Sequence, residues 1–513
     1  MEYLDSVAGK DILYSFAFVG LAIVLWLGSI AWKRRGQRQD HPPAQSSIPP
    51  ERWERAAAAT RPVTQADRDL AARMIDGMVA QVRHEQDIDE MRGQEPVVVR
   101  LAPQIPIREH EAPRSWLGGE PEMPAGADWP EVDGRPAVFL AQVCCADLPA
   151  DLWDGLGPRG GWLAFFLHPE DYRMQVLHLT ARGPARPGPA LGEESWFNPA
   201  GGLATKTLPH ATKRAFPRWP VDVVTVRPGD PDPRLGGDAD ATFKLYKQGY
   251  DLASPEHQPF DWDSTLAMLD IVEETVSARA ESSTAHADRL PEQLRGVLQK
   301  LKDAEQSAEP PDNLEILRSH ARHLPVLIDA TDRAREMIVT AAAELEAIGR
   351  AVRERAGRVP FSPAEVAPLM TRLREIEWLH VRRPTAVELE ETVLPLTVHD
   401  PDAPLWAADF ETLRFDWAKH AYCRSPSSLP PAVRDFYERL WRDLAPHEMA
   451  GMGHVPFNYV HAFDPATEVT LIELPSSDLM SWMFGDVDNL VVTMTKADLA
   501  AGDFSALKVQ VSN

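Results

Sequence analysis

Cysteine is scarce in this chain. Its 513 residues include only Cys144, Cys145 and Cys423, and a disulfide between the two adjacent cysteines would be strained. The sequence therefore has no disulfide framework, as is typical of proteins in a reducing compartment. Because an apolar stretch, residues 139–143, leads directly into Cys144 and Cys145, we interpret this pair as small apolar residues of a buried strand rather than as a thiol site.

Positive charge is also in short supply. The chain has 53 lysines and arginines against 77 aspartates and glutamates, which gives a formal net charge of −24. A protein this acidic repels nucleic-acid phosphate, so we expect no nucleic-acid partner. Hydrophobic residues make up 44% of the sequence and charged residues 25%, which is typical of a folded globular protein and, at this length, of two or three domains.

The sequence contains no complete catalytic, cofactor or metal motif. Gly118 and Gly119 lack the lysine and the serine or threonine of a phosphate-binding loop, which favours a tight turn. His447 and His454 do not have the spacing that brings two imidazoles to one zinc ion. Residues 485–489 supply oxygen atoms but form too short a loop for an EF-hand. We therefore predict no cofactor and no metal, and we favour a non-enzymatic role.

One long apolar run stands near the N-terminus. Residues 12–32, ILYSFAFVGLAIVLWLGSIAW, contain no charged side chain. At about 1.5 Å per residue, a helix over this run is about 30 Å long, the thickness of the hydrocarbon core of a bilayer. The run is too long for the apolar part of a cleaved signal peptide, and the residues before it are not basic enough for one. It predicts a single transmembrane helix in contact with the lipid bilayer.

The charges beside this run predict its orientation. Only Lys10 precedes it closely, whereas four basic residues follow it: Lys33, Arg34, Arg35 and Arg38. By the positive-inside rule, the large C-terminal part of the chain faces the cytoplasm and residues 1–11 form a short external tail. We therefore expect a single-pass protein of the bacterial inner membrane.

Hydrophobic periodicity divides the rest of the chain. Short apolar runs broken by glycine and proline predict strands in two separate stretches, at 162–167, 221–226, 469–474 and 490–494. Between these stretches, apolar residues recur at helical spacing, as at Leu294, Val297, Leu298 and Leu301. Ser362 as N-cap, Pro363 in the first turn and Glu365 as the glutamate of a capping box predict the start of a further helix.

This order predicts an α+β fold: a mainly antiparallel β domain interrupted by a helical insertion, with one N-terminal transmembrane helix. The two β-rich stretches have comparable lengths, which suggests two halves of one domain. After the transmembrane helix, the predicted parts are a basic flank, linker and juxtamembrane helix at 33–95, the first half of the β domain at 96–262, the helical insertion at 263–398 and the second half at 399–513.

Several linked motifs occur in order along the two β-rich stretches. The first stretch holds SWLGGEPEMP at 115–124, DGRP at 133–136, FLAQV at 139–143 and GGWLAFF at 160–166. The second holds HEMAG at 447–451, LIEL at 471–474 and MFGD at 483–486. Together they resemble the YwqG-like family of bacterial proteins. The resemblance implies an α+β domain with a mainly antiparallel sheet, and it implies no biochemical activity. This chain lacks the family's usual glycine directly after Asp486.

Six residues are our candidates for a ligand site. Gln142 follows a strongly apolar strand, and a buried amide must be hydrogen-bonded, either to a ligand or to a loop. The glycines could bring backbone N–H groups close to a ligand. The candidates are Gly118, Gly119, Trp129, Gln142, Gly485 and Asp486.

Two functional hypotheses follow. The first is a membrane-anchored interaction or scaffold protein that faces the cytoplasm and binds a protein partner through its helical insertion and the cleft of the YwqG-like domain. The 15 tryptophans favour a binding surface as well as a packed core. The second is a small-ligand-binding protein or enzyme with a cleft in the YwqG-like domain, formed where the six candidates meet.

Overall fold

A computed structural model of the chain describes residues 94–191, 196–199, 213–307, 312–385, 388–456 and 463–512, and a few helical residues between 72 and 83. The chain forms two compact units, Met1–Ala80 and Gln81–Asn513. The described residues of the first unit, Ala72–Ile75, Gly77 and Val79, are helical and exposed. All the strands that the structure describes, and the long helices, lie in the second unit.

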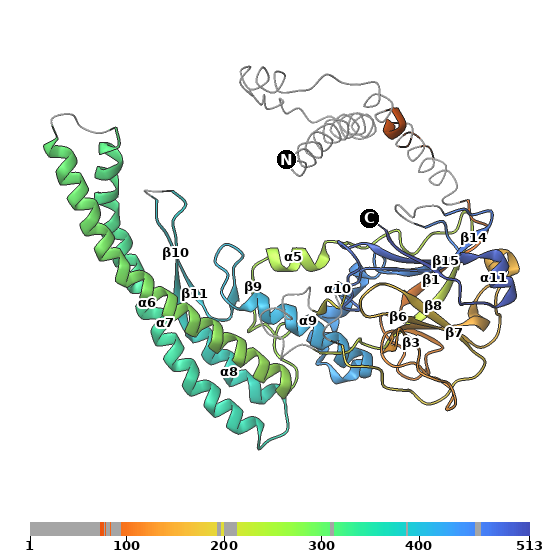
Figure 1. The fold of residues 1–513 in the computed structure, drawn as a ribbon. Coiled ribbons are helices and arrows are strands. Elements are labelled where there is room, and N and C mark those ends of the chain that lie inside the picture. The colour runs from red at the N-terminus through yellow and green to blue at the C-terminus, as the bar shows by residue number, and fades with distance from the viewer. Residues whose placement is uncertain are drawn as a thin grey trace. The chain divides into compact units, whose positions relative to one another are not determined.

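The second unit contains a ten-stranded antiparallel sheet (Figure 1). Its strand order is β16-β15-β14-β13-β1-β8-β2-β5-β6-β7, so strands from both ends of the unit share one sheet. The two sets meet where β1 pairs with β13, with Val99 opposite Met452 and Leu101 opposite Ala450. The strands are β1 Val98–Pro103, β2 Ser115–Leu117, β5 Val138–Cys144, β6 Trp162–Leu167, β7 Met174–Leu179, β8 Trp219–Val226, β13 Ala450–Met452, β14 Glu468–Pro475, β15 Asn489–Thr495 and β16 Lys508–Ser512. The α+β class and the antiparallel sheet are as expected.

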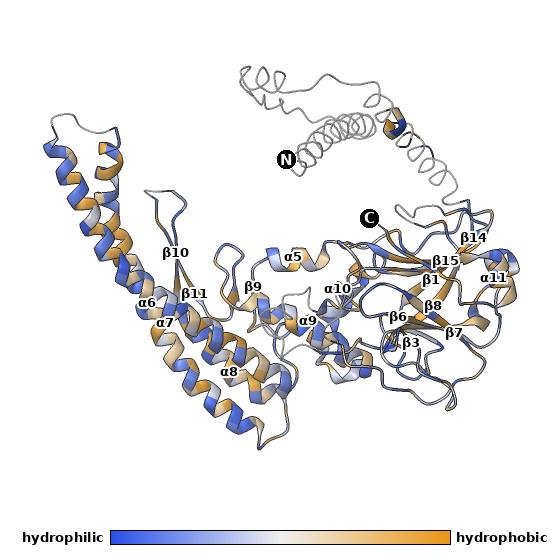
Figure 2. Ribbon diagram, viewed as in Figure 1, coloured by the Kyte–Doolittle hydropathy of each residue, from blue (hydrophilic) through white to orange (hydrophobic). Residues whose placement is uncertain are grey.

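The central strands are buried on both faces. Along β6, Leu163 and Phe165 point into the main hydrophobic core, whereas Ala164 and Phe166 point into a smaller cluster on the other face. This alternation follows from the two-residue period of a strand. It explains why the sequence of β6 is a continuous apolar run, and Figure 2 shows such apolar residues concentrated on the strands of the sheet.

Two long helices, which come between the two sets of strands in the sequence, form a hairpin. α6 (Trp262–Gln306) and α7 (Leu314–Ala356) lie side by side along their length (Figure 1). A capping box starts α6: the Asp261 carboxylate accepts a hydrogen bond from the Ser264 N–H at 2.6 Å, and the Ser264 hydroxyl oxygen accepts one from the Asp261 N–H at 3.1 Å.

The two helices of this hairpin contribute to a second hydrophobic core. It includes residues of α8 (Pro363–Glu375) and of the two-stranded sheet β10 (Glu377–Arg382) and β11 (Glu390–Pro395). The segment that we predicted as helical, 263–398, therefore also contains a β-hairpin, whose strands pair from Glu377 opposite Pro395 to Arg382 opposite Glu390.

One helix belongs to both cores. α9 (Ala407–Arg424) places Phe410 and Leu413 in the second core, and Phe415 and Ala418 in the main one. The remaining elements are α5 Ala241–Lys247, α10 Pro431–Leu444, α11 Lys496–Ala501, β3 Glu131–Val132, β4 Arg135–Pro136, β9 Tyr250–Asp251, β12 Val398–His399, and the short 3-10 helices Cys145–Asp147, Leu152–Gly155 and Pro426–Ser428.

The prediction of a transmembrane helix is corrected. Among the residues that the structure describes, no helix is both long enough and apolar enough to cross a membrane. The longest, α6 and α7, have 45 and 43 residues, but charged side chains recur along both of them, as the hydropathy colours of Figure 2 show. Residues 12–32 and the basic residues Lys33, Arg34, Arg35 and Arg38 lie outside the described ranges. The bilayer anchor, the single-pass topology and the inner-membrane localisation are therefore withdrawn.

Candidate functional site

A cavity that borders the sheet lies between a glycine turn, two loops and the end of α9. Its volume is about 630 Å³. We call it the basic cleft. It is lined by Gly119, Glu120, Val138, Phe139, residues 187–191, residues 214–218, His420, Cys423 and Arg424. Segments far apart in the sequence therefore meet here.

Positive charge gathers around the basic cleft. Arg214 and Arg424 are exposed, and neither forms an ion pair with any residue in the described ranges. Arg218 adds a third guanidinium, while Glu120 is the single acidic residue among those lining the cavity. The chain as a whole has a net charge of −24, so the lining of the basic cleft reverses the sign of the overall charge.

His420 brings a buried polar atom to the basic cleft. Its Nε2 is shielded from solvent and has no hydrogen-bond partner within the part of the chain that the structure describes. Burial lowers the pKa of His420 to about 4; the neighbouring Asp416 opposes this shift, while the charges of Lys419, Lys213 and Arg424 reinforce it. The imidazole is therefore neutral near pH 7, with one nitrogen that donates and one that accepts. A buried polar atom without a partner is rare in proteins, and it suits contact with a ligand.

Arg218 is held in place by a chain of contacts that begins at Gln142. The Gln142 side chain accepts a hydrogen bond from the Glu122 N–H at 2.9 Å and donates one to the Glu122 carbonyl at 3.3 Å. The Glu122 carboxylate in turn accepts a hydrogen bond from Arg218 Nη2 at 2.6 Å. The guanidinium also lies over the Trp116 ring, 4.2 Å from its centroid. Gln142 thus positions a residue of the basic cleft and does not line the cleft itself.

The glycine pair allows two segments to approach closely. Gly118 and Gly119 have φ angles of +60° and +66°, which side chains disfavour. A Cβ on Gly118 would lie 2.6 Å from Met480 Cε, and one on Gly119 would lie 2.8 Å from Arg218 Cγ. The pair is therefore a tight turn against residues 216–218, and Gly119 lines the cleft.

Trp129 supports the edge of the basic cleft. Its Nε1 donates a hydrogen bond to the Ala137 carbonyl at 2.9 Å, and its ring packs edge-on against Phe166. Gly188, a lining residue, approaches this ring so closely that a Cβ there would lie 3.2 Å from it.

Gly485 and Asp486 lie in a turn that does not line the basic cleft. The Asp486 N–H donates a hydrogen bond to the Asp488 carboxylate at 3.0 Å, and both Gly485 and Asp486 are exposed or nearly so. The six sequence candidates thus separate into one lining residue, three that surround or support the cleft, and two that lie elsewhere.

A buried serine and lysine close to the cleft have the composition of a catalytic pair. Ser481 has a φ of +58°, and its hydroxyl lies 2.5 Å from Lys419 Nζ. Lys419 also forms an ion pair with Asp416 at 3.0 Å, and all three side chains are almost fully buried. A lysine in an ion pair cannot accept the proton of the serine, and neither Lys419 nor Ser481 lines the cavity. These residues fix α9 to the loop at 477–484.

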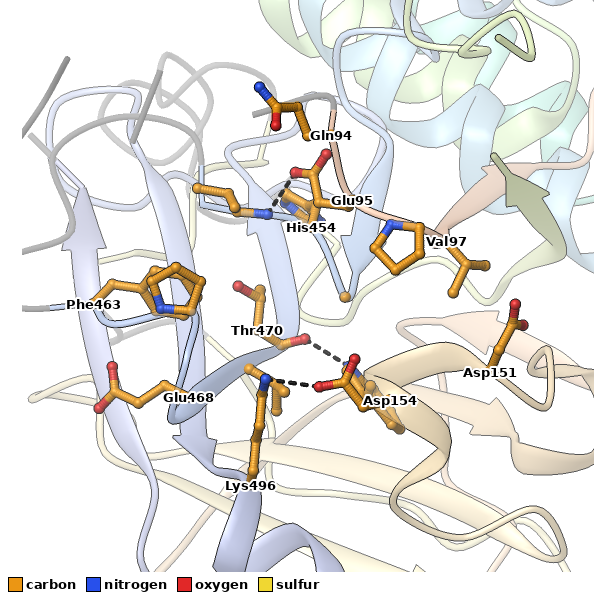
Figure 3. A pocket seen from close by; sticks show the side chains of 16 residues that line it. Gln94, Glu95, Val97, Asp151, Asp154, His454, Phe463, Glu468, Thr470 and Lys496 are labelled. Carbon is orange, nitrogen blue, oxygen red and sulfur yellow. Dashed lines mark hydrogen bonds and ion pairs between the residues drawn. The ribbon is translucent and has the colours of Figure 1, made fainter. Parts of the chain in front are cut away.

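A further cavity of about 230 Å³ lies between the start of β1 and the loop before β14 (Figure 3). Its charged groups are engaged with the protein. Lys496 pairs with Asp154 at 2.7 Å, and the Glu95 carboxylate accepts a hydrogen bond from the Val455 N–H at 2.9 Å, as the dashed lines in Figure 3 show. His454 beside it pairs with Glu473 at 2.8 Å, and the described residues contain no cluster of acidic, histidine or cysteine side chains that could hold a metal ion.

The basic residues of the cleft were absent from our sequence candidates. Arg214, Arg218, His420 and Arg424 come from segments about 200 residues apart, and no local pattern joins them. One signal was available: Lys213 and Arg214 with Arg218 form a basic patch in an acidic chain.

Comparison with known families places part of this site in a known domain family. Residues 115–186 match the model of a family described as a domain of unknown function, DUF1963, to which YwqG-like domains belong. The match spans β2 to β7 and includes Gly118, Gly119, Trp129 and Gln142. A search of curated proteins gave no match.

Proposed function

We propose that this protein binds a small organic anion in the basic cleft. The observation that carries the proposal is the group of cations around a cavity of about 630 Å³, with two guanidiniums, Arg214 and Arg424, that form no ion pair in the described ranges. A guanidinium presents a planar fork of donors that matches a carboxylate or phosphate. The neutral imidazole of His420 supplies one further hydrogen bond.

The rest of the lining indicates what kind of anion fits. Val138, Phe139, Leu191 and Phe216 give the cleft apolar walls beside its basic residues. Pockets of about 300–1,000 Å³ hold small organic ligands, and most bind through apolar walls with a few placed polar groups. The ligand is therefore an organic molecule with a carboxylate or phosphate group.

Binding fits the chemistry of the basic cleft better than catalysis. Cys423 carries the one thiol among the lining residues, and burial holds its pKa well above the ordinary value. A protonated thiol is a poor nucleophile. No other pair of nucleophile and base lies among the residues lining the cleft.

We also infer that the YwqG-like domain includes both sets of strands. The family match at 115–186 and the antiparallel pairing of β1 with β13 support this wider assignment. A scaffold role with a protein partner stays a prediction, because none of the described contacts bears on it.

Isothermal titration calorimetry tests the binding proposal. Glucose 6-phosphate, citrate and inorganic phosphate are titrated into the purified protein, with glucose as the neutral counterpart. We expect at least one organic anion to bind and glucose not to bind. Arg214→Gln and Arg424→Gln should each weaken binding about tenfold, because each removes a charge-assisted contact. Affinity should also fall as salt is added.

The matched control is Arg439→Gln, which changes an exposed arginine of α10 outside the cleft. It should bind as the unmodified protein does. Equal binding of glucose and glucose 6-phosphate would contradict the proposal, and so would equal losses in the control and the cleft variants.

A further inference from the structure

A separate cavity of about 390 Å³ lies in the helical part of the protein, between α6, α7 and β10. It borders the second hydrophobic core and shares no residue with the basic cleft. We call it the arm cavity. Residues Arg279, Ser282, Ser283 and His286 of α6 line one side, and Trp378, Leu379 and Val381 of β10 line another.

The arm cavity has donors that lack an acceptor. Trp378 is 1% exposed, and its Nε1 has no hydrogen-bond partner within the described part of the chain. An indole N–H can only donate, and leaving it buried and unpaired is unfavourable. Arg279 is exposed and forms no ion pair with a described residue. No aspartate or glutamate lines this cavity, and none of the described residues accepts a hydrogen bond from Trp378 Nε1, which leaves this donor for a bound molecule.

The floor of the arm cavity is apolar. Leu290, Leu327 and Ile338 line it together with two residues of β10, Leu379 and Val381. A molecule that fills the space must therefore carry an apolar body as well as an acceptor.

Two prolines border the arm cavity. Pro291 follows the lining residue Leu290 in α6, and Pro325 lies two residues before the lining residue Leu327 in α7. Proline has no N–H for the helical ladder, and its ring presses on the preceding turn, which bends a helix. Each of the two helices therefore lacks one backbone hydrogen bond beside the arm cavity.

We propose that the arm cavity binds a small amphipathic carboxylate. Its carboxylate accepts hydrogen bonds from Trp378 Nε1 and from the Arg279 guanidinium, and its hydrocarbon body lies on the leucine and isoleucine floor. The proposal is independent of the basic cleft, because the two cavities have different linings and different cores.

The test uses the purified protein with 5-fluorotryptophan in place of tryptophan, read by fluorine NMR. The Trp378 signal is the one that disappears in Trp378→Phe, which keeps an aromatic ring and removes the N–H. Octanoate is titrated first. Acetate, which has the charge without the tail, and 1-octanol, which has the tail without the charge, are the matched probes.

We expect octanoate to shift the Trp378 signal in a saturable way. Acetate and 1-octanol should need at least about tenfold higher concentrations to produce the same shift. Arg279→Gln should lower the affinity for octanoate about tenfold, because it removes a charged hydrogen bond. Arg295→Gln, another exposed arginine of α6 that does not line the cavity, should change nothing.

Three results would overturn the proposal: equal binding of 1-octanol and octanoate, shifts confined to other tryptophan signals, or no shift of Trp378 at millimolar octanoate. A folding defect in Arg279→Gln is recognised separately, because it would move many of the tryptophan signals before any ligand is added. In that case the three probes are compared on the unmodified protein, where the order of their affinities decides.

Discussion

Replacing Lys419 by methionine should destabilise the protein severely. Lys419 is fully buried in α9, and its ammonium lies 3.0 Å from the Asp416 carboxylate. It also donates hydrogen bonds to the Asp478 carbonyl at 2.6 Å and to the Ser481 hydroxyl at 2.5 Å. Methionine fills a similar volume, so the substitution removes charge and hydrogen bonds with little change in packing.

The size of the expected loss of stability follows from the carboxylate that Lys419→Met leaves without a cation. Asp416 would stay at 0% exposure without its cation, with the Ser481 hydroxyl as its remaining side-chain donor, because its second oxygen already has no partner among the described residues. Removing one member of a buried ion pair costs about 3–5 kcal/mol. Since a domain is stable by about 5–15 kcal/mol, the loss should amount to about a fifth of the total or more.

Urea unfolding, followed by circular dichroism and tryptophan fluorescence, measures the effect. The control is Lys496→Met. Lys496 forms an ion pair of similar length with Asp154, but the two side chains are 27% and 58% exposed, so the loss should stay below about 1 kcal/mol. Adding Asp416→Asn to Lys419→Met should restore much of the stability, because it removes the carboxylate that has lost its cation. A loss no greater than that of the control, or a double variant less stable than Lys419→Met alone, would refute the reasoning.

Two further predictions concern the loops around the basic cleft. Burial, reinforced by the charge of Asp478, raises the pKa of Glu448 to about 7 from an ordinary 4.5, so the folded protein binds a proton there that the unfolded chain has lost. The contribution of Glu448 to stability should therefore fall as pH rises from about 4.5 to about 7, and Glu448→Gln should flatten this part of the pH dependence of the urea midpoint; an unchanged slope would count against it. Gly118→Ala should cost about 1–3 kcal/mol, because the new methyl meets Met480 and Phe216 at a positive φ, whereas Gly160→Ala, which meets nothing within 4 Å, should be neutral in the same urea titration. Equal losses in the two alanine variants would show that the glycine turn is not under steric constraint.

The sequence predicts the strands that carry a strong local signal. The apolar runs at 162–167 and 490–494 correspond to β6 and β15, because a strand buried on both faces must be apolar at nearly every position. The start of α8 was also predicted correctly at Pro363, although the reason differs in part. Glu365 pairs with Arg355 of α7 and does not close a capping box, so a tertiary contact replaces the local one.

The strand β13 could not be predicted. It has three residues, and its centre is Gly451, where a Cβ would lie 2.7 Å from His454 Cε1 and 2.9 Å from Arg100 Nη1. A glycine normally weakens the case for a strand, and only the neighbouring side chains show why it is required here. Yet β13 joins the two sets of strands into one sheet, so the decisive element for the topology is among the weakest in the sequence.

The basic cleft could not be predicted from the sequence either, because its geometry depends on how α9 is placed. The first half of α9 lies in the second core and its last turn supplies His420 and Arg424 to the cleft. Apolar contacts alone leave a helix considerable freedom to rotate or slide, since they are not directional. A buried charge has no such freedom, because it must meet its partner.

The charged residues of two buried ion pairs within α9 supply this constraint through their contacts with other segments. Burial by itself would raise the pKa of Glu411, but Arg414 and His257 together hold it down to about 2, and the Tyr437 hydroxyl donates a further hydrogen bond to it at 2.7 Å. One turn later, Lys419 meets Asp416 and the loop at 477–484. A shift of α9 by a single residue would leave both ion pairs intact, because they lie within the helix, but would break their contacts with His257, Tyr437 and the loop at 477–484. We infer that the charged residues of α9 fix its rotation, and through it the position of His420, Cys423 and Arg424 at the basic cleft.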